Sequence, residues 1–120
     1  MTRDGQRLND YLAHITEAIE RVNRYADGFD EQAFLMNQMA QDAVVRNFEI
    51  IGEASHNIET KFPEFTAAHP ELPLAPAYQM RNAIAHGYFK VDFAIVWQTI
   101  HTDLPNLYRL VNEARSGLMK

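Results

Sequence analysis

The sequence contains no cysteine, which excludes disulfide bonds, thiolate zinc sites and cysteine nucleophiles together. It also lacks any apolar run near the roughly 18 residues of a membrane span, and its N-terminus lacks the apolar core of a secretory signal. A formal net charge of -5 argues against the broad basic surface with which some proteins coat nucleic acid, but it leaves room for an RNA-processing site with locally clustered cations. We therefore expect a cytoplasmic protein with no membrane segment, in which any metal would need histidine and carboxylate ligands.

The composition is otherwise that of an ordinary folded protein. Hydrophobic residues make up 47% of the 120 residues and charged residues 22%, values close to the globular average. A chain of this length can bury one hydrophobic core. We expect residues 1–120 to form a single domain.

The first half of the chain has the apolar spacing of helices. Apolar residues recur every three or four positions over residues 8–25, and Gly28 follows as a stop signal. Asp30 can cap a short second helix, and a further apolar pattern, broken near Asn37, continues to about Lys61. These patterns predict one long helix, then a short helix leading into another long one.

Prolines are few and concentrated. Four of the five lie in residues 62–76, too many for a helix interior, so this segment is predicted to be the main loop. Pro76 suits the first position of a helix over residues 77–86. Gly87 then stands where a left-handed helix cap is usual.

The last part of the chain predicts one more helix, capped by Asp92 and kinked by Pro105. Trp97, Phe89 and Phe93 lie near helical core positions, so they are expected to pack the core rather than to stack on bases. No segment alternates with a two-residue period. The predicted fold class is an all-α, antiparallel helical bundle of four main helices plus a short extra helix.

One short stretch concentrates side chains that handle phosphate. Arg81, Asn82, His86 and Tyr88 supply a permanent cation, an amide, an imidazole and a phenol within eight positions. Arginine binds phosphate with a planar fork of donors, and histidine titrates closest to neutral pH. This combination makes the stretch a candidate active site for phosphodiester chemistry.

Helical geometry alone does not bring the arginine and histidine together. Asn82 lies one turn below His86, whereas Arg81 is five residues back and about 140° around the helix. The two converge if the last turn loosens, if the long arginine reaches around, or if a twofold partner brings a second copy opposite. The alternative is an arginine in a surface ion pair and a histidine that caps the last carbonyls.

A polar stripe on the long middle helix is the second candidate feature. Asp42, Arg46, Glu49 and Glu53 share one face of a helix that is otherwise strongly apolar. Such a stripe lines a cleft or subunit contact, or else it is a solvated edge on which Asp42 pairs with Arg46. Gly52, in mid-helix, indicates a close approach of another helix.

A metal site has little support in the sequence. Glu53 and His56 match the Glu-x-x-His pair of di-metal helical bundles, but those sites need a second such pair and further carboxylates. The segment beginning at His101 has even less support as a metal site. His14 and His69 have no such surroundings in the sequence and are expected to be surface residues. We expect neither a metal nor a cofactor.

Two blocks together resemble one family. The chain is similar to the HepT-like family of HEPN-domain toxins, whose signature is Arg, four residues, His, one residue, Tyr. The similarity covers nearly the whole chain. The matching residues are Met80–Tyr88, Val91–Asp92, Ile95–Trp97 and Asp103–Pro105 and, for the family's third helix, Asp42–Val44, Arg46–Asn47 and Ile50–Ala54.

The resemblance implies a function and partners. It implies a HEPN-like helical bundle, a homodimer with Arg81 and His86 near the dimer cleft, and metal-independent cleavage of RNA by these two catalytic residues. It also implies a type II toxin-antitoxin system, in which an MNT-type nucleotidyltransferase antitoxin neutralises the toxin, in some members by attaching AMP to the tyrosine that corresponds to Tyr88. Asn82 and Arg46 would bind or orient the RNA.

We expect the RNA 2'-hydroxyl to attack the neighbouring phosphorus, which leaves a 2',3'-cyclic phosphate. His86 would move the proton and Arg81 would stabilise charge on the phosphorane. The sequence does not identify the general base: a second His86 across the dimer could supply it, or Tyr88 could take part, although a phenol with an ordinary pKa is mostly protonated at neutral pH. The alternative function is a non-catalytic helical module that binds nucleotide or presents a substrate to a nucleotidyltransferase.

Overall fold

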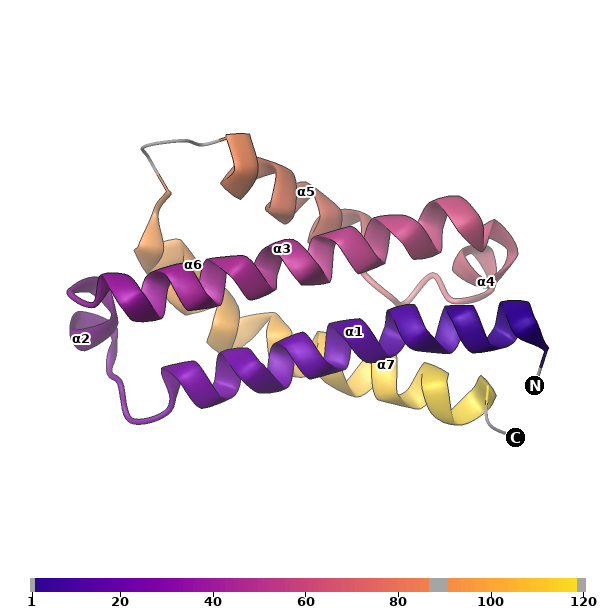
Figure 1. Cartoon of the computed structure of the whole chain (residues 1–120), viewed down its shortest axis with the longest axis horizontal. Helices are drawn as coiled ribbons and strands as arrows, with labels where there is room; N and C mark the ends of the chain where they lie inside the picture. The colour runs from indigo at the N-terminus through magenta and orange to yellow at the C-terminus, as the bar shows by residue number, and fades with distance from the viewer. Residues whose placement is uncertain (1, 87–90, 119–120) are drawn as a thin grey trace.

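The computed structural model describes residues 2–86 and 91–118, with only the backbone described for residues 85 and 86. The described residues form helices and no strands, which confirms the all-α fold class. Figure 1 shows the helices in chain order: α1 (Arg3–Ala26), α2 (Glu31–Leu35), α3 (Gln38–Lys61), α4 (Pro63–Ala68), α5 (Leu74–His86), α6 (Phe93–Thr102) and α7 (Leu104–Leu118).

Local capping signals set the ends of the first three helices. Asp30 accepts a hydrogen bond from the backbone of Ala33 at the start of α2, and Asn37 caps α3 in the same way. After α1, Gly28 adopts a positive φ of 83°, which a residue without Cβ reaches without strain. The predicted short helix, break near Asn37 and long helix are therefore confirmed.

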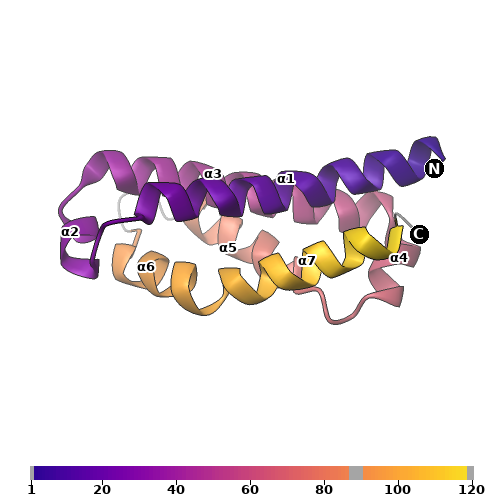
Figure 2. The same cartoon turned by 90° about the horizontal axis from the view of Figure 1, so that it is seen from below.

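The two longest helices, α1 and α3, lie side by side and antiparallel (Figures 1 and 2). A second layer covers one side of this pair: α5 packs along α3, and α7 packs along α1 (Figure 2). The core lies between these layers, and its largest fully buried side chains are Phe34, Phe48, Leu12, Ile15, Ile19, Ile51, Ile58, Leu74 and Leu104. None of the described helices combines the length and apolar character needed to cross a bilayer.

The proline-rich segment is more helical than predicted. Residues 63–68 form the short helix α4, with Pro63 in its first turn, where a missing backbone N–H costs nothing. α5 begins at Leu74, so Pro76 lies inside its first turn rather than at its first position. The expected cap at Gly87 lies outside the described residues.

The last predicted helix is two helices. The chain breaks at Asp103, between α6 and α7, instead of only kinking at Pro105. The physical reason is that the proline has no N–H, and its ring clashes with the carbonyl four residues earlier, so a continuous helix is blocked just before it. Phe93 and Trp97 pack against buried Phe34, as predicted for core residues. Phe89 lies outside the described residues.

Candidate active site between α1, α3 and α5

The position of Arg81 is set by an unusually close contact between α3 and α5. A Cβ atom added to Gly52 of α3 would overlap the Cβ of Arg81, and it would lie 2.8 Å from Arg81 Cγ and 3.1 Å from the carbonyl oxygen of Ala77. Only glycine leaves space for the arginine stem at this contact. The close helix approach predicted from Gly52 is confirmed.

Both terminal nitrogens of the Arg81 guanidinium contact a neighbouring side chain. Its Nη1 donates to Oδ1 of the neighbouring Asn82 at 3.1 Å, and its Nη2 lies 3.4 Å from Oε2 of Glu53. Its Nε is buried and has no hydrogen-bond partner among the described residues. Arg81 therefore takes the surface ion pair that the sequence analysis left open, but its side chain is only 31% exposed and lies at a helix contact.

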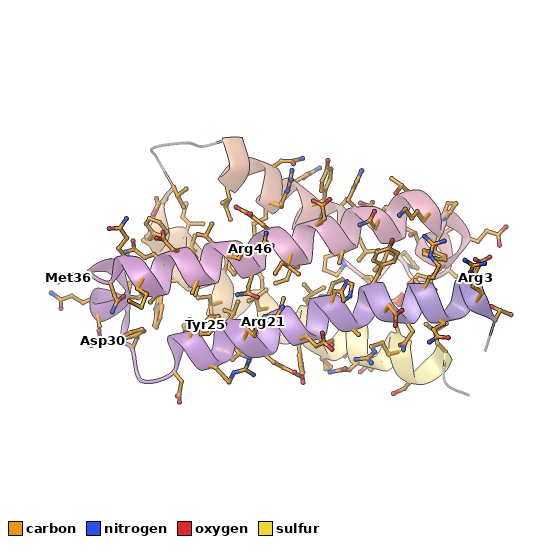
Figure 3. All side chains as sticks on the ribbon, viewed as in Figure 1. Arg3, Arg21, Tyr25, Asp30, Met36 and Arg46 are labelled. Carbon is orange, nitrogen blue, oxygen red and sulfur yellow. The ribbon has the colours of Figure 1, made fainter. Side chains whose placement is uncertain are left out.

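The same arginine lines a cavity of about 220 Å³ between α1, α3 and α5. Arg46 also lines it, near the middle of α3 and away from the end of the bundle where Met36 lies (Figure 3). The lining residues are Tyr11, His14, Arg46, Glu49, Ile50, Glu53, Ala54, Asn57 and Arg81. The cavity is smaller than the several hundred Å³ of typical small-molecule pockets.

Three residues of the predicted polar stripe face this cavity. Arg46, Glu49 and Glu53 line it, whereas exposed Asp42 does not. Arg46 Nη1 lies 3.6 Å from Glu49 Oε2, so its ion pair is with Glu49 rather than with Asp42. The stripe is thus a cleft wall that carries two carboxylates and a cation, with a second cation supplied by Arg81.

Three residues of the cavity wall were not predicted from the sequence. Asn57 extends the stripe by one turn beyond Glu53, so periodicity could have found it. Tyr11 and His14 come from α1, and no local signal relates them to α3 or α5. The expectation for His14 was incomplete: it is exposed, as predicted, but it also lines the cavity beside Arg81.

Tyr11 is fixed in this wall by a residue of α3. Its hydroxyl oxygen accepts a hydrogen bond of 2.9 Å from Lys61 Nζ, and its ring meets His14 edge-on, with ring centroids 6.1 Å apart. The hydrogen bond from the ammonium stabilises the phenolate and lowers the pKa of Tyr11. The α1 side of the cavity therefore presents a positioned phenol and an exposed imidazole.

The other histidines have different partners. His56 stacks on Tyr78, with ring centroids 4.0 Å apart and planes at 17°, while Glu53 turns to Arg81. His69 pairs with a neighbouring glutamate, and His101 hydrogen-bonds the carbonyl oxygen of Trp97. Among the described residues, no cluster of three histidine, aspartate or glutamate side chains has a geometry that suits a metal ion.

Comparison with known proteins identifies the family. The family described as "Ribonuclease HepT-like" matches residues 15–114, which include all of α3, α5 and α6. The chain belongs to the ribonuclease HepT-like family. It is 41% identical over 98 residues to "Probable ribonuclease HepT" of Thermococcus cleftensis, a match that covers 82% of this chain and 86% of that protein.

A second HepT-like relative is more distant. The chain is 34% identical over 103 residues to "Putative RNase TTE0752" of Caldanaerobacter subterraneus subsp. tengcongensis, and the match covers 86% of this chain and 89% of that protein. No solved structure gave a significant match. The matched region of this HepT-like chain contains every residue that lines the cavity except Tyr11 and His14.

The remaining residues of the HepT-like motif are only partly described. The backbone of α5 continues to His86, the last residue of the helix, but its side chain lies outside the described part. Tyr88 lies outside it altogether. Asn82 is described, and its side chain binds the guanidinium of Arg81. The site that the structure describes is thus the arginine half of the motif with its surrounding cavity.

Proposed function

We propose that this protein is a metal-independent endoribonuclease and the toxin of a type II toxin-antitoxin system. The observation that carries the proposal is family membership over residues 15–114, with relatives named as ribonucleases, together with a motif arginine that lines a polar cavity. An arginine held at both ends provides the fixed cation that phosphoryl transfer needs. The cavity has room for one scissile phosphate.

In the proposed reaction, the RNA 2'-hydroxyl attacks the adjacent phosphorus and expels the 5'-oxygen of the next nucleotide. Arg81 neutralises the charge that develops on the phosphorane oxygens. His86, at the C-terminal end of α5, protonates the leaving oxygen, since a helix C-terminus favours the imidazolium form. Arg46 and Asn82 orient the RNA, Arg46 through the backbone phosphates and Asn82 through its hold on Arg81.

The proposal extends to control of the enzyme. An MNT-type nucleotidyltransferase antitoxin attaches AMP to Tyr88, two residues after His86 in the sequence. The added phosphate places negative charge beside the site of an anionic substrate, and this repulsion blocks RNA binding without unfolding the protein. The active form is a homodimer in which the two motifs lie near the dimer cleft.

The direct test is incubation of purified protein with RNA in excess chelator. We expect cleavage that persists in chelator, leaves 2',3'-cyclic phosphate ends and disappears in His86→Ala and Arg81→Ala. His101 is an exposed residue of α6 that does not line the cavity, so the control variant His101→Ala should cleave RNA like the wild type. Cleavage that requires a divalent metal would contradict the mechanism.

A growth assay separates this function from the non-catalytic alternative. Expression of the chain without a partner should arrest growth, and His86→Ala should relieve the arrest. A module that only presents substrate to a nucleotidyltransferase would leave growth unchanged in both cases. Co-expression with the nucleotidyltransferase should restore growth, and mass spectrometry should find added AMP that is lost in Tyr88→Phe.

A further inference from the structure

A carboxylate lies directly beside the catalytic arginine of the proposed reaction. Glu53 extends from α3 and brings Oε2 to 3.4 Å from Arg81 Nη2, and both residues line the same cavity. The Glu53 side chain is 62% exposed, twice the value for Arg81. The carboxylate is therefore open to a ligand that enters the cavity, while the stem of the arginine is enclosed.

Stability does not account well for this carboxylate. An ion pair with this much exposure contributes only about 0–1 kcal/mol to folding. Arg81 already has its stem fixed against Gly52 and its Nη1 bound to Asn82. A negative charge beside a site for an anionic phosphate also opposes binding, so a role in the reaction itself explains its presence better.

We propose that Glu53 is the general base of the RNA cleavage reaction, and this inference rests on the proposed function. A general base must come within about 2.6–3.2 Å of the oxygen that loses its proton. The attacking 2'-oxygen bonds to the same phosphorus whose oxygens the Arg81 guanidinium would hold. Glu53 Oε2 lies 3.4 Å from Arg81 Nη2, so a phosphate bound to that guanidinium would place its neighbouring 2'-hydroxyl on the side of the cavity where this carboxylate lies.

Glu53 and His86 together account for both proton transfers of the cleavage step. The 2'-oxygen forms its bond to phosphorus as its proton passes to a carboxylate oxygen of Glu53. The bond from phosphorus to the 5'-oxygen breaks, and that oxygen takes a proton from His86. Water then removes the proton from Glu53 and returns one to His86, so the enzyme is restored and the products are a cyclic phosphate and a 5'-hydroxyl.

Other charged and titratable groups share the cavity and must be considered. They are Tyr11 and His14 on α1, Arg46 and Glu49 on α3, and Arg81 on α5. Glu49 pairs with Arg46, at 3.6 Å, instead of with the catalytic arginine. Of the carboxylates in this cavity, Glu53 alone is in contact with Arg81 among the described residues.

The test uses Glu53→Gln, which keeps an oxygen that can accept from Arg81 but cannot take a proton at neutral pH. We expect a loss in kcat of about a hundred- to ten-thousand-fold. Binding of 2'-O-methyl RNA, which cannot react, should be at least as tight as in the wild type, because the variant removes a negative charge beside the phosphate site. The fall in rate on the acidic side of the pH profile should disappear, whereas Glu53→Asp should keep it with a reduced kcat.

Glu113→Gln is the matched control. Glu113 forms a similarly exposed ion pair with Arg109 on α7, at 3.0 Å, and neither residue lines the cavity, so its variant should keep the wild-type kcat and pH profile. Circular dichroism and urea unfolding check that each variant is folded. If Glu53→Gln does not fold, the pH profile of Glu53→Asp decides the question.

Several results would overturn the inference. One is a wild-type kcat in Glu53→Gln, and another is a kcat reduced equally at every pH, which would mean that Glu53 only positions Arg81. Loss of the acidic limb in His14→Gln or Glu49→Gln instead would assign the base to that residue. If the wild type cleaves RNA and His86→Ala does not, any of the outcomes above contradicts the role of Glu53 alone and leaves the proposed function standing. If the wild type does not cleave RNA, both the proposed function and the role of Glu53 fail.

Discussion

Substitution of Gly52 by alanine should both weaken the fold and disturb Arg81. In an ordinary helix interior, this change gains about 1 kcal/mol because alanine has the higher helix propensity. At Gly52, the new methyl would overlap Arg81 Cβ, an atom fixed to the backbone of α5 rather than the end of a flexible side chain. α5 must therefore move away from α3.

The size of the effect follows from two opposing contributions. Overpacking of a close contact typically costs about 1–3 kcal/mol, against the gain of about 1 kcal/mol in propensity. Since both the Arg81 stem and the Ala77 carbonyl oppose the methyl, we expect the upper part of this range and a net loss of about 1–2 kcal/mol in the free energy of unfolding. A shift of about 1 Å in a catalytic group can lower the rate on the order of a hundredfold.

The assay is urea unfolding, followed by circular dichroism, together with RNA cleavage under single-turnover conditions. Gly117→Ala is the control, because Gly117 is an exposed residue of α7 and a Cβ there meets nothing within 4 Å. We expect that variant to unfold at the same or higher urea concentration and to cleave normally. Equal stability of the two variants, with equal cleavage, would refute the argument that Gly52 sets the α3–α5 contact.

Three further predictions concern other parts of the bundle. Asp92→Ala removes the side chain that accepts from the first backbone N–H groups of α6 and should cost about 1 kcal/mol in urea unfolding, with Asp92→Asn close to the wild type. Lys61→Met removes the hydrogen bond that lowers the pKa of Tyr11, so the tyrosinate absorbance that is lost in Tyr11→Phe should shift to higher pH; an unchanged titration would contradict that assignment. Phe34→Ala empties a fully buried position and should cost about 3–5 kcal/mol, and the emission of the single tryptophan, which packs on this ring, should shift to the red; a loss below 1 kcal/mol would contradict its core role.

Most of the fold could be predicted because its signals are local. Asp30, Asn37 and Asp92 each accept from backbone N–H groups within three residues, so the short-range sequence fixes where those helices begin. The segment around Pro63 was predicted less well. A proline is excluded from a helix interior but is tolerated in the first turn, and residue type alone does not tell whether a proline ends a helix or begins one.

The residues of the candidate site that carry local signals could also be predicted from the sequence. Arg81 and Arg46 were found because a motif and a helical stripe mark them within a few residues of sequence. The role of Gly52 was also visible, since a glycine costs stability in mid-helix unless another element needs the space. These conclusions use only residue type and helical period.

The sequence by itself determined an all-helical chain, the starts of α2, α3 and α6, and the arginine on which the candidate site is built. Only the tertiary structure decided that Glu53 reaches Arg81 and that Tyr11 and His14 complete the cavity. The physical reason is that helix caps and periodicity act within one or two turns. The contact of one helix with another depends on the register at which their side chains interdigitate, and the whole packed core sets that register.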